Sequence, residues 1–111
     1  MKTKVIWLDD FREPYHFLYE EGYKAEEIKI CKNYSQFVEV IENEGLPELI
    51  CYDHDLGEEK TGYDCAKYIV NYCLERKEQL PNWYIQSSNI VGALNIDGLF
   101  EALKRSQGEK K

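Results

Sequence analysis

The chain has 111 residues and a mass of 13.1 kDa, a size that suits a single hydrophobic core. Hydrophobic residues make up 43% of the chain and charged residues 32%, a balance that excludes a disordered protein. The 21 acidic and 14 basic residues give a net charge of -7, which argues against binding an extended nucleic-acid backbone through a basic face.

The sequence also bears on location. No apolar run approaches the roughly 20 residues that span a bilayer, and no signal-peptide cleavage pattern follows the first residues. The four cysteines contain no C-x-x-C pair and no spacing with histidine that is typical of zinc sites. We therefore predict a cytoplasmic protein without membrane contact, whose cysteines are buried and reduced.

Short apolar runs alternate with amphipathic segments along the first half of the chain. A continuous apolar run predicts a strand over residues 4–9, and a helix is expected over 14–21 with a proline in its first turn. A second strand is predicted over 27–31. The side chain of Asn33 can then cap a helix that ends at Gly45.

The same alternation continues in the second half. A third strand is predicted over residues 48–53, followed by a polar loop over 55–62 and a clear amphipathic helix over 63–75. A fourth strand over 83–86 leads into a last helix over 91–105.

Alternating strands and helices predict an α/β fold with a parallel sheet. We expect a flavodoxin-like three-layer sandwich of four strands in the order 2-1-3-4, with helices on both faces. Residues 1–105 would form one domain, and residues 106–111 a polar, frayed tail.

Acidic, hydroxyl or amide side chains follow three of the four predicted strands. They are Asp9 and Asp10, then Asp53, His54 and Asp55, and finally Ser87, Ser88 and Asn89. Ligands of parallel sheets bind beyond the carboxyl ends of the strands. If the first and third strands are neighbours, Asp9, Asp10 and Asp53 converge and repel one another. A hard divalent cation, Mg²⁺ or Mn²⁺, relieves that repulsion.

Each of these motifs also has a purely local interpretation. An Asp-Asp pair or a Ser-Ser-Asn run is common as a turn or a helix cap, and the segment from Asp53 to Gly57 could be a turn. His54 could donate a proton to a leaving oxygen, or it could orient Asp53. Tyrosines at helical spacing predict half-buried core residues, and they also fit a protein partner or a homodimer.

The strand ends resemble those of the receiver domains of two-component signalling. In that comparison the acidic pair is Asp9-Asp10, the phosphoacceptor is Asp53 and the hydroxyl residue is Ser87. A full receiver also has a fifth strand that ends in a lysine, and then a fifth helix. We expect this chain to lack both, which argues against phosphorelay activity.

The sequence more closely resembles the cyclic-phosphate processing receiver domains, from Val5 to about Leu103. The matching motifs are Leu8-Asp9-Asp10-Phe11-Arg12-Glu13-Pro14, Asp53-His54-Asp55-Leu56-Gly57, Thr61-Gly62-Tyr63-Asp64 and Gln86-Ser87-Ser88-Asn89-Ile90-Val91-Gly92. The family has a histidine where this chain has Gln86, and glutamine cannot shuttle a proton at neutral pH.

The resemblance implies metal-dependent processing or binding of a phosphoester, such as a cyclic phosphate of a nucleotide or RNA end. The expected metal ligands are Asp9, Asp10, Asp53 and Asp55, and the expected phosphate-binding residues are Arg12, Gln86, Ser87, Ser88, Asn89 and Gly92. Asp53 and His54 are the catalytic candidates of a Mg²⁺-dependent phosphoesterase. The alternative is a signalling or protein-interaction module with Asp53 at the phosphoacceptor position and no turnover.

Overall fold

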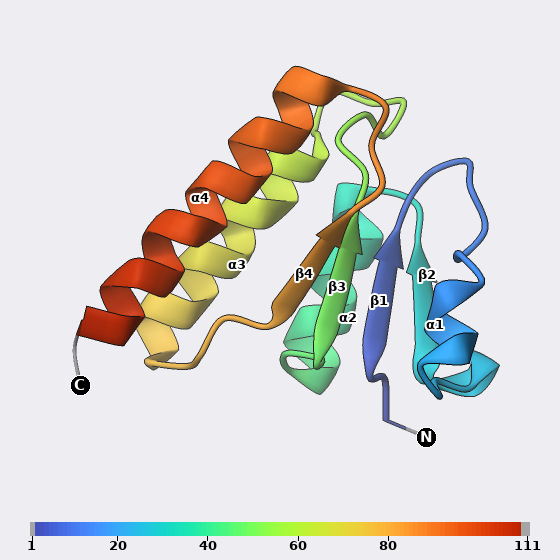
Figure 1. Ribbon diagram of the computed structural model, residues 1–111, viewed down its shortest axis with the longest axis horizontal. Coiled ribbons are helices and arrows are strands. Elements are labelled where there is room, and N and C mark those ends of the chain that lie inside the picture. Colours follow the sequence, from blue (N-terminus) through green and yellow to red (C-terminus); the bar gives the residue numbers. More distant parts are fainter. Residues whose placement is uncertain (1, 110–111) are drawn as a thin grey trace.

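The computed structural model describes residues 2–109 and contains one four-stranded parallel sheet in the order β2-β1-β3-β4 (Figure 1). The strands are β1 (Val5–Leu8), β2 (Ile28–Cys31), β3 (Leu49–Tyr52) and β4 (Asn82–Ile85). The predicted flavodoxin-like fold and its strand order are confirmed. The central strands β1 and β3 are almost wholly buried, as expected for a parallel sheet that is covered on both faces.

The register brings the carboxyl ends of the strands to one level. Leu8 pairs with Tyr52, which in turn pairs with Ile85. The backbone of Asp53 then donates to the carbonyl oxygen of Leu8 at 2.9 Å. The residues that follow β1, β3 and β4 therefore emerge side by side at the edge where such sheets bind ligands.

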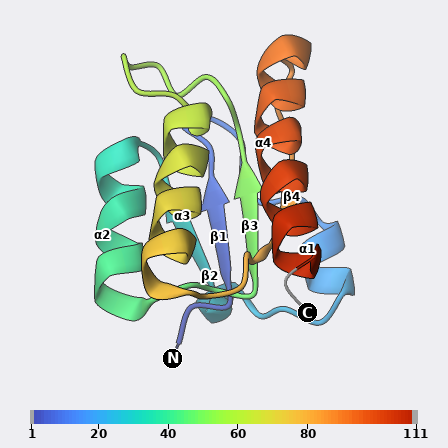
Figure 2. The same ribbon diagram turned by 90° about the vertical axis from the view of Figure 1, so that its left-hand side faces the viewer.

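Helices cover the two faces of the sheet unequally. The three longer helices, α2 (Tyr34–Glu44), α3 (Gly62–Arg76) and α4 (Ile90–Glu109), lie on one face, and α1 (Phe17–Glu20) lies on the other (Figures 1 and 2). The main core lies beneath the three longer helices, with Phe37, Tyr52 and Phe100 among its buried aromatic residues.

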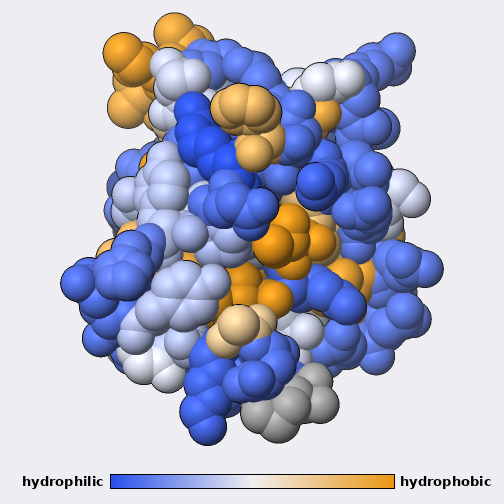
Figure 3. Space-filling view, turned by 90° about the vertical axis from the view of Figure 1, so that its right-hand side faces the viewer, coloured by the Kyte–Doolittle hydropathy of each residue, from blue (hydrophilic) through white to orange (hydrophobic). Residues whose placement is uncertain are grey.

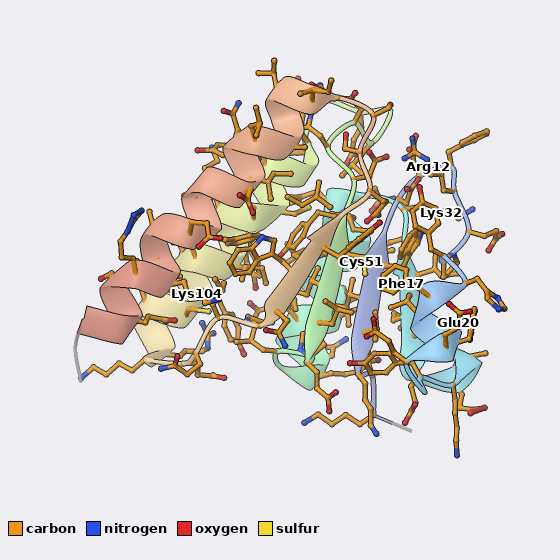
Figure 4. The ribbon with its side chains drawn as sticks, viewed as in Figure 1. Arg12, Phe17, Glu20, Lys32, Cys51 and Lys104 are labelled. Carbon is orange, nitrogen blue, oxygen red and sulfur yellow. The ribbon has the colours of Figure 1, made fainter. Side chains whose placement is uncertain are left out.

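Aromatic side chains supplement the short helix α1 on its face of the sheet. Trp7 is fully buried there and packs edge-on against Tyr15, with ring centroids 5.0 Å apart. Tyr84, the register partner of the buried Cys51, packs against Phe17 with ring centroids 4.8 Å apart, and Figure 4 labels Phe17 and Cys51 on this face. This smaller core lies on the face of β1 and β3 opposite the main core.

The helix predicted over residues 14–21 is wrong in extent, because α1 begins only at Phe17. The segment before it is held in an irregular path: the indole Nε1 of Trp7 donates to the carbonyl oxygen of Arg12 at 3.0 Å. Pro14 therefore lies in this segment, outside the helix. Elsewhere the predicted cap is present, since the side chain of Asn33 accepts from the backbone of Gln36 at 2.8 Å.

The last helix is longer than expected. Residues 106–109 of the predicted tail belong to α4, and residues 110–111 lie outside the described residues. The side chain of Gln107 explains the extension, because it donates to the carbonyl oxygen of Glu78 at 3.0 Å and accepts from the backbone of Leu80 at 3.3 Å. These bonds hold the end of α4 against the segment that leads into β4.

All four cysteines are free and buried. Burial raises the pKa of the thiols, to about 11 for Cys31 and to about 12 for Cys51, so both stay protonated at neutral pH. The tyrosines of α3 are mostly covered, with Tyr72 buried and Tyr68 half-buried; a protein contact through tyrosines stays a prediction. Among residues 2–109, no helix has both the length and the apolar character to cross a membrane.

Candidate functional site

Three carboxylates meet at the carboxyl ends of β1 and β3. Asp9 and Asp53 are only 1% and 6% exposed, whereas Asp10 is open to solvent. One oxygen from each of the three side chains lies within 4.8 Å of the other two. We call these three residues the acid group. The predicted neighbour relation of the first and third strands is what brings them together.

Arg12 lies against the two buried members of the acid group. Its Nη1 atom is 3.4 Å from Oδ2 of Asp9 and 3.8 Å from Oδ1 of Asp53. The other oxygen of Asp9 accepts the backbone N–H groups of Phe11 at 2.9 Å and Arg12 at 2.8 Å. Asp9 is therefore both the residue that shapes the loop after β1 and a partner of the guanidinium.

The electrostatics of the acid group favour a positive charge. Burial is the main cause that raises the pKa of Asp53, and the nearby charge of Asp9 raises it further. Arg12 and the hydrogen bonds from the backbone of His54 and the side chain of Ser87 lower it in part. The net shift is upward, so the ionised carboxylate is incompletely compensated by the protein alone.

The donor set of the acid group fits Mg²⁺ or Mn²⁺. All its ligand atoms are carboxylate oxygens, which hard divalent cations prefer. Two of the carboxylates are buried and one faces solvent, so a bound ion would keep positions for water or a phosphate oxygen.

Two glycines allow the loop between β3 and α3 to close over the acid group. A Cβ atom at Gly62 would lie 1.8 Å from the carbonyl oxygen of Asp53, and the backbone of Gly62 donates to His54 at 2.7 Å. Gly57 has a φ of +67°, and a Cβ there would lie 2.9 Å from Oδ2 of Asp10. Neither role was predicted from the sequence, although both glycines lie in the motifs that match the family.

His54 and Asp55 lie beside the start of α4. The Nδ1 atom of His54 is 2.8 Å from Oδ1 of Asp55. The amide nitrogen of Asn89 lies 3.3 Å from each of these two atoms. These hydrogen bonds, first that of His54, lower the pKa of Asp55. Asp55 was expected to help hold the metal through its backbone or side chain; the side chain contacts His54 and Asn89, and a metal-binding role of Asp55 stays a prediction.

Gly92 makes room for the imidazole of His54. A Cβ atom at this position would lie 2.4 Å from Cγ of the His54 ring. The backbone N–H of Gly92 donates to Oδ1 of Asn89 at 2.9 Å, so Asn89 caps α4. Gly92 was expected to help bind phosphate; in the structure its N–H is already used by the cap.

The hydroxyl and amide side chains after β4 serve both the cap and the site. The Oγ atom of Ser87 accepts from the backbone of Asn89 at 3.0 Å, and the Ser87 side chain lies near enough to Asp53 to lower the pKa of its carboxyl group. Ser88 is exposed at the same turn. The local and the functional interpretations of this motif are thus compatible, with Ser87 the member nearest the acid group.

Gln86 is a structural bridge. Its Nε2 atom donates to the carbonyl oxygen of Leu8 at 3.0 Å, across the end of β3, and its side chain is buried. Its Oε1 atom has no hydrogen-bond partner among the described residues. The amide donor predicted to bind phosphate is therefore engaged with the backbone of β1.

A cavity of about 360 Å³ adjoins the acid group on the side of β2. It is lined by Asp9, Phe11, Arg12, Glu13, Ile30, Lys32 and Gln36. A larger cavity of about 760 Å³ lies near the C-terminal ends of α3 and α4, where Lys77, Trp83 and Lys104 line it. The smaller cavity is the one in contact with the candidate site.

The comparison with known families agrees with this arrangement. The model of the cyclic-phosphate processing receiver domain matches residues 4–102. The chain therefore belongs to the family of cyclic-phosphate processing receiver domains, as the sequence motifs indicated. No curated protein and no solved structure matches the chain significantly.

Proposed function

We propose that this receiver-like domain binds a divalent cation at the acid group and uses it to process a phosphoester, such as a cyclic phosphate of a nucleotide or RNA end. One observation supports this most strongly. Three carboxylates, two of them buried, lie within 4.8 Å of one another at the ligand-binding edge of the sheet, in a family named for cyclic-phosphate processing.

Asp9, Asp10 and Asp53 would hold the cation. When bound, Mg²⁺ or Mn²⁺ polarises a phosphoryl group and lowers the pKa of a coordinated water. Arg12 lies against the same carboxylates, and its planar guanidinium can pair with two phosphate oxygens at once. Arg12 would thus exchange a carboxylate partner for the phosphate when the site is loaded.

Ser87 and His54 would act on the phosphoester from the β4 side. The hydroxyl of Ser87 already contacts Asp53 and can donate to a phosphate oxygen. The hydrogen bond to Asp55 orients the imidazole of His54 through Nδ1, which leaves Nε2 for proton exchange with a ligand oxygen.

Phosphorus NMR tests the proposed reaction directly. The protein is incubated with adenosine 2′,3′-cyclic phosphate and Mg²⁺, beside Asp53→Asn and beside a sample with excess chelator. The proposal predicts conversion to a phosphomonoester in the first sample and none in the other two. Absence of conversion together with labelling of Asp53 by a small phosphodonor would instead support the signalling alternative.

A further inference from the structure

We propose that the 360 Å³ cavity beside the acid group is a nucleobase site, which holds the ring of a nucleotide whose phosphate lies at the acid group. This inference rests on the proposed function and names the organic part of its substrate. Asp9 and Arg12 line the cavity and also form part of the phosphate-binding region, so the two sites are continuous.

The cavity lies over the edge strand β2, on the face of the sheet that the short helix α1 covers only in part. In Figure 1, α1 lies toward the amino ends of β1 and β2. Ile30 of β2, the register partner of the buried Trp7, is 40% exposed and lines the cavity. Figure 3 shows hydrophobic surface among charged side chains on this side of the molecule.

Phe11 supplies an aromatic ring at the cavity. Its side chain is 90% exposed, which is unusual for phenylalanine and leaves its faces open to a planar ligand. Its backbone N–H donates to Oδ1 of Asp9 at 2.9 Å, which holds the backbone of Phe11 beside the acid group. Bases stack on such rings without regard to sequence.

The polar residues that line the cavity can form hydrogen bonds with the edge of a base. The backbone of Lys32 donates to Oε1 of Gln36 at 2.8 Å, and this leaves Nε2 of Gln36 and the ammonium of Lys32 as donors. Arg12 and Lys32 lie on the same side of the molecule, at the carboxyl ends of β1 and β2 (Figure 4). Base edges offer ring nitrogens and carbonyl oxygens as acceptors for these donors.

The size of the cavity and the charge of the chain favour a single nucleotide over a polymer or a protein. Small-ligand pockets start at about 300 Å³, and this one is near that limit. A stable protein partner would need about 800 Å² of contact from each side. An extended nucleic acid would meet the net charge of -7 without a basic face.

Calorimetric titrations in the presence of Mg²⁺ test the inference with two stable monoesters, adenosine 3′-monophosphate and glycerol 2-phosphate. We expect the adenosine ester to bind about tenfold more tightly. Phe11→Ala should weaken it about fivefold to tenfold and leave the glycerol ester unchanged, whereas Phe11→Tyr should retain the wild-type affinity for both. Leu94→Ala, which removes another exposed apolar side chain, from α4, should change neither.

The results that would overturn the inference can be told apart from failure of the proposed function. If wild type binds Mg²⁺ and both esters with equal affinity, or if Phe11→Ala changes nothing, the nucleobase site is wrong and the proposed function stands. If wild type binds neither Mg²⁺ nor glycerol 2-phosphate, the proposed function fails and the nucleobase site fails with it.

Discussion

The guanidinium of Arg12 lies 3.4 Å from the buried carboxylate of Asp9, at the place where the sequence predicts a metal ion. The Arg12 guanidinium therefore places a positive charge at the acid group. Its side chain is 30% exposed and belongs to the loop that follows β1. In the proposed function, binding of a divalent ion would therefore be coupled to release of Arg12 from the carboxylates.

Replacement of Arg12 by alanine should strengthen Mg²⁺ binding. A unit charge about 4 Å away is worth roughly 1 kcal/mol even at the dielectric constant of water, so we expect at least about fivefold tighter binding. The same variant should bind a phosphate monoester more weakly, because it lacks the guanidinium fork. Calorimetry of both ligands makes the comparison, with the exposed Arg105→Ala as the matched control. Unchanged or weaker Mg²⁺ binding in Arg12→Ala would contradict the exchange.

Replacement of Gly92 by alanine should displace the imidazole of His54. The added Cβ would lie 2.4 Å from the ring, so the expected loss of stability is about 1–3 kcal/mol. Gly98 of the same helix has nothing within 4 Å, and Gly98→Ala should stabilise by roughly 0.5–1 kcal/mol. Urea unfolding of the two variants measures both values. Equal changes in stability at the two positions would show that the position of the His54 ring does not depend on Gly92.

The strands, their order and the convergence of three acids were predictable from the sequence, because apolar runs and crossover rules are local or general. The partners of Gln86 and Gly92 were not. Gln86 reaches a carbonyl oxygen 78 residues away, and the role of Gly92 depends on a ring that comes from another loop. Such contacts depend on the distance between elements, which no sequence period encodes.

The contact of Arg12 with the acid group could likewise not be predicted from the sequence. Its sequence motif marked it as a phosphate ligand, and its contact with the acid group follows from the bend that Asp9 imposes on the next residues. That bend, together with the hydrogen bond from Trp7 to the Arg12 carbonyl, also delays α1. A local propensity for helix after Pro14 was overridden by these tertiary contacts.

Asp53 should reduce the stability of the metal-free protein at neutral pH. Its pKa in the folded state is raised, chiefly by burial, so its favourable contribution is complete below pH 3.8 and is lost as the pH rises through the folded-state pKa. Asp53→Asn should therefore have a higher midpoint of thermal unfolding than wild type at pH 7 without Mg²⁺, and the gap should shrink toward pH 4. Thermal unfolding followed by circular dichroism tests this. A variant that unfolds at a lower temperature than wild type at pH 7 would contradict the predicted direction of the effect.

The most direct test of the account is a calorimetric Mg²⁺ titration of wild type beside Asp53→Asn. Asp53 is buried in the acid group, and the asparagine variant keeps its shape while removing its charge. A divalent-cation site at the acid group predicts saturable binding by wild type and at least about tenfold weaker binding by the variant, since a carboxylate ligand is lost. Equal binding by both proteins, or none by wild type, would contradict a divalent-cation site at the carboxyl ends of β1 and β3.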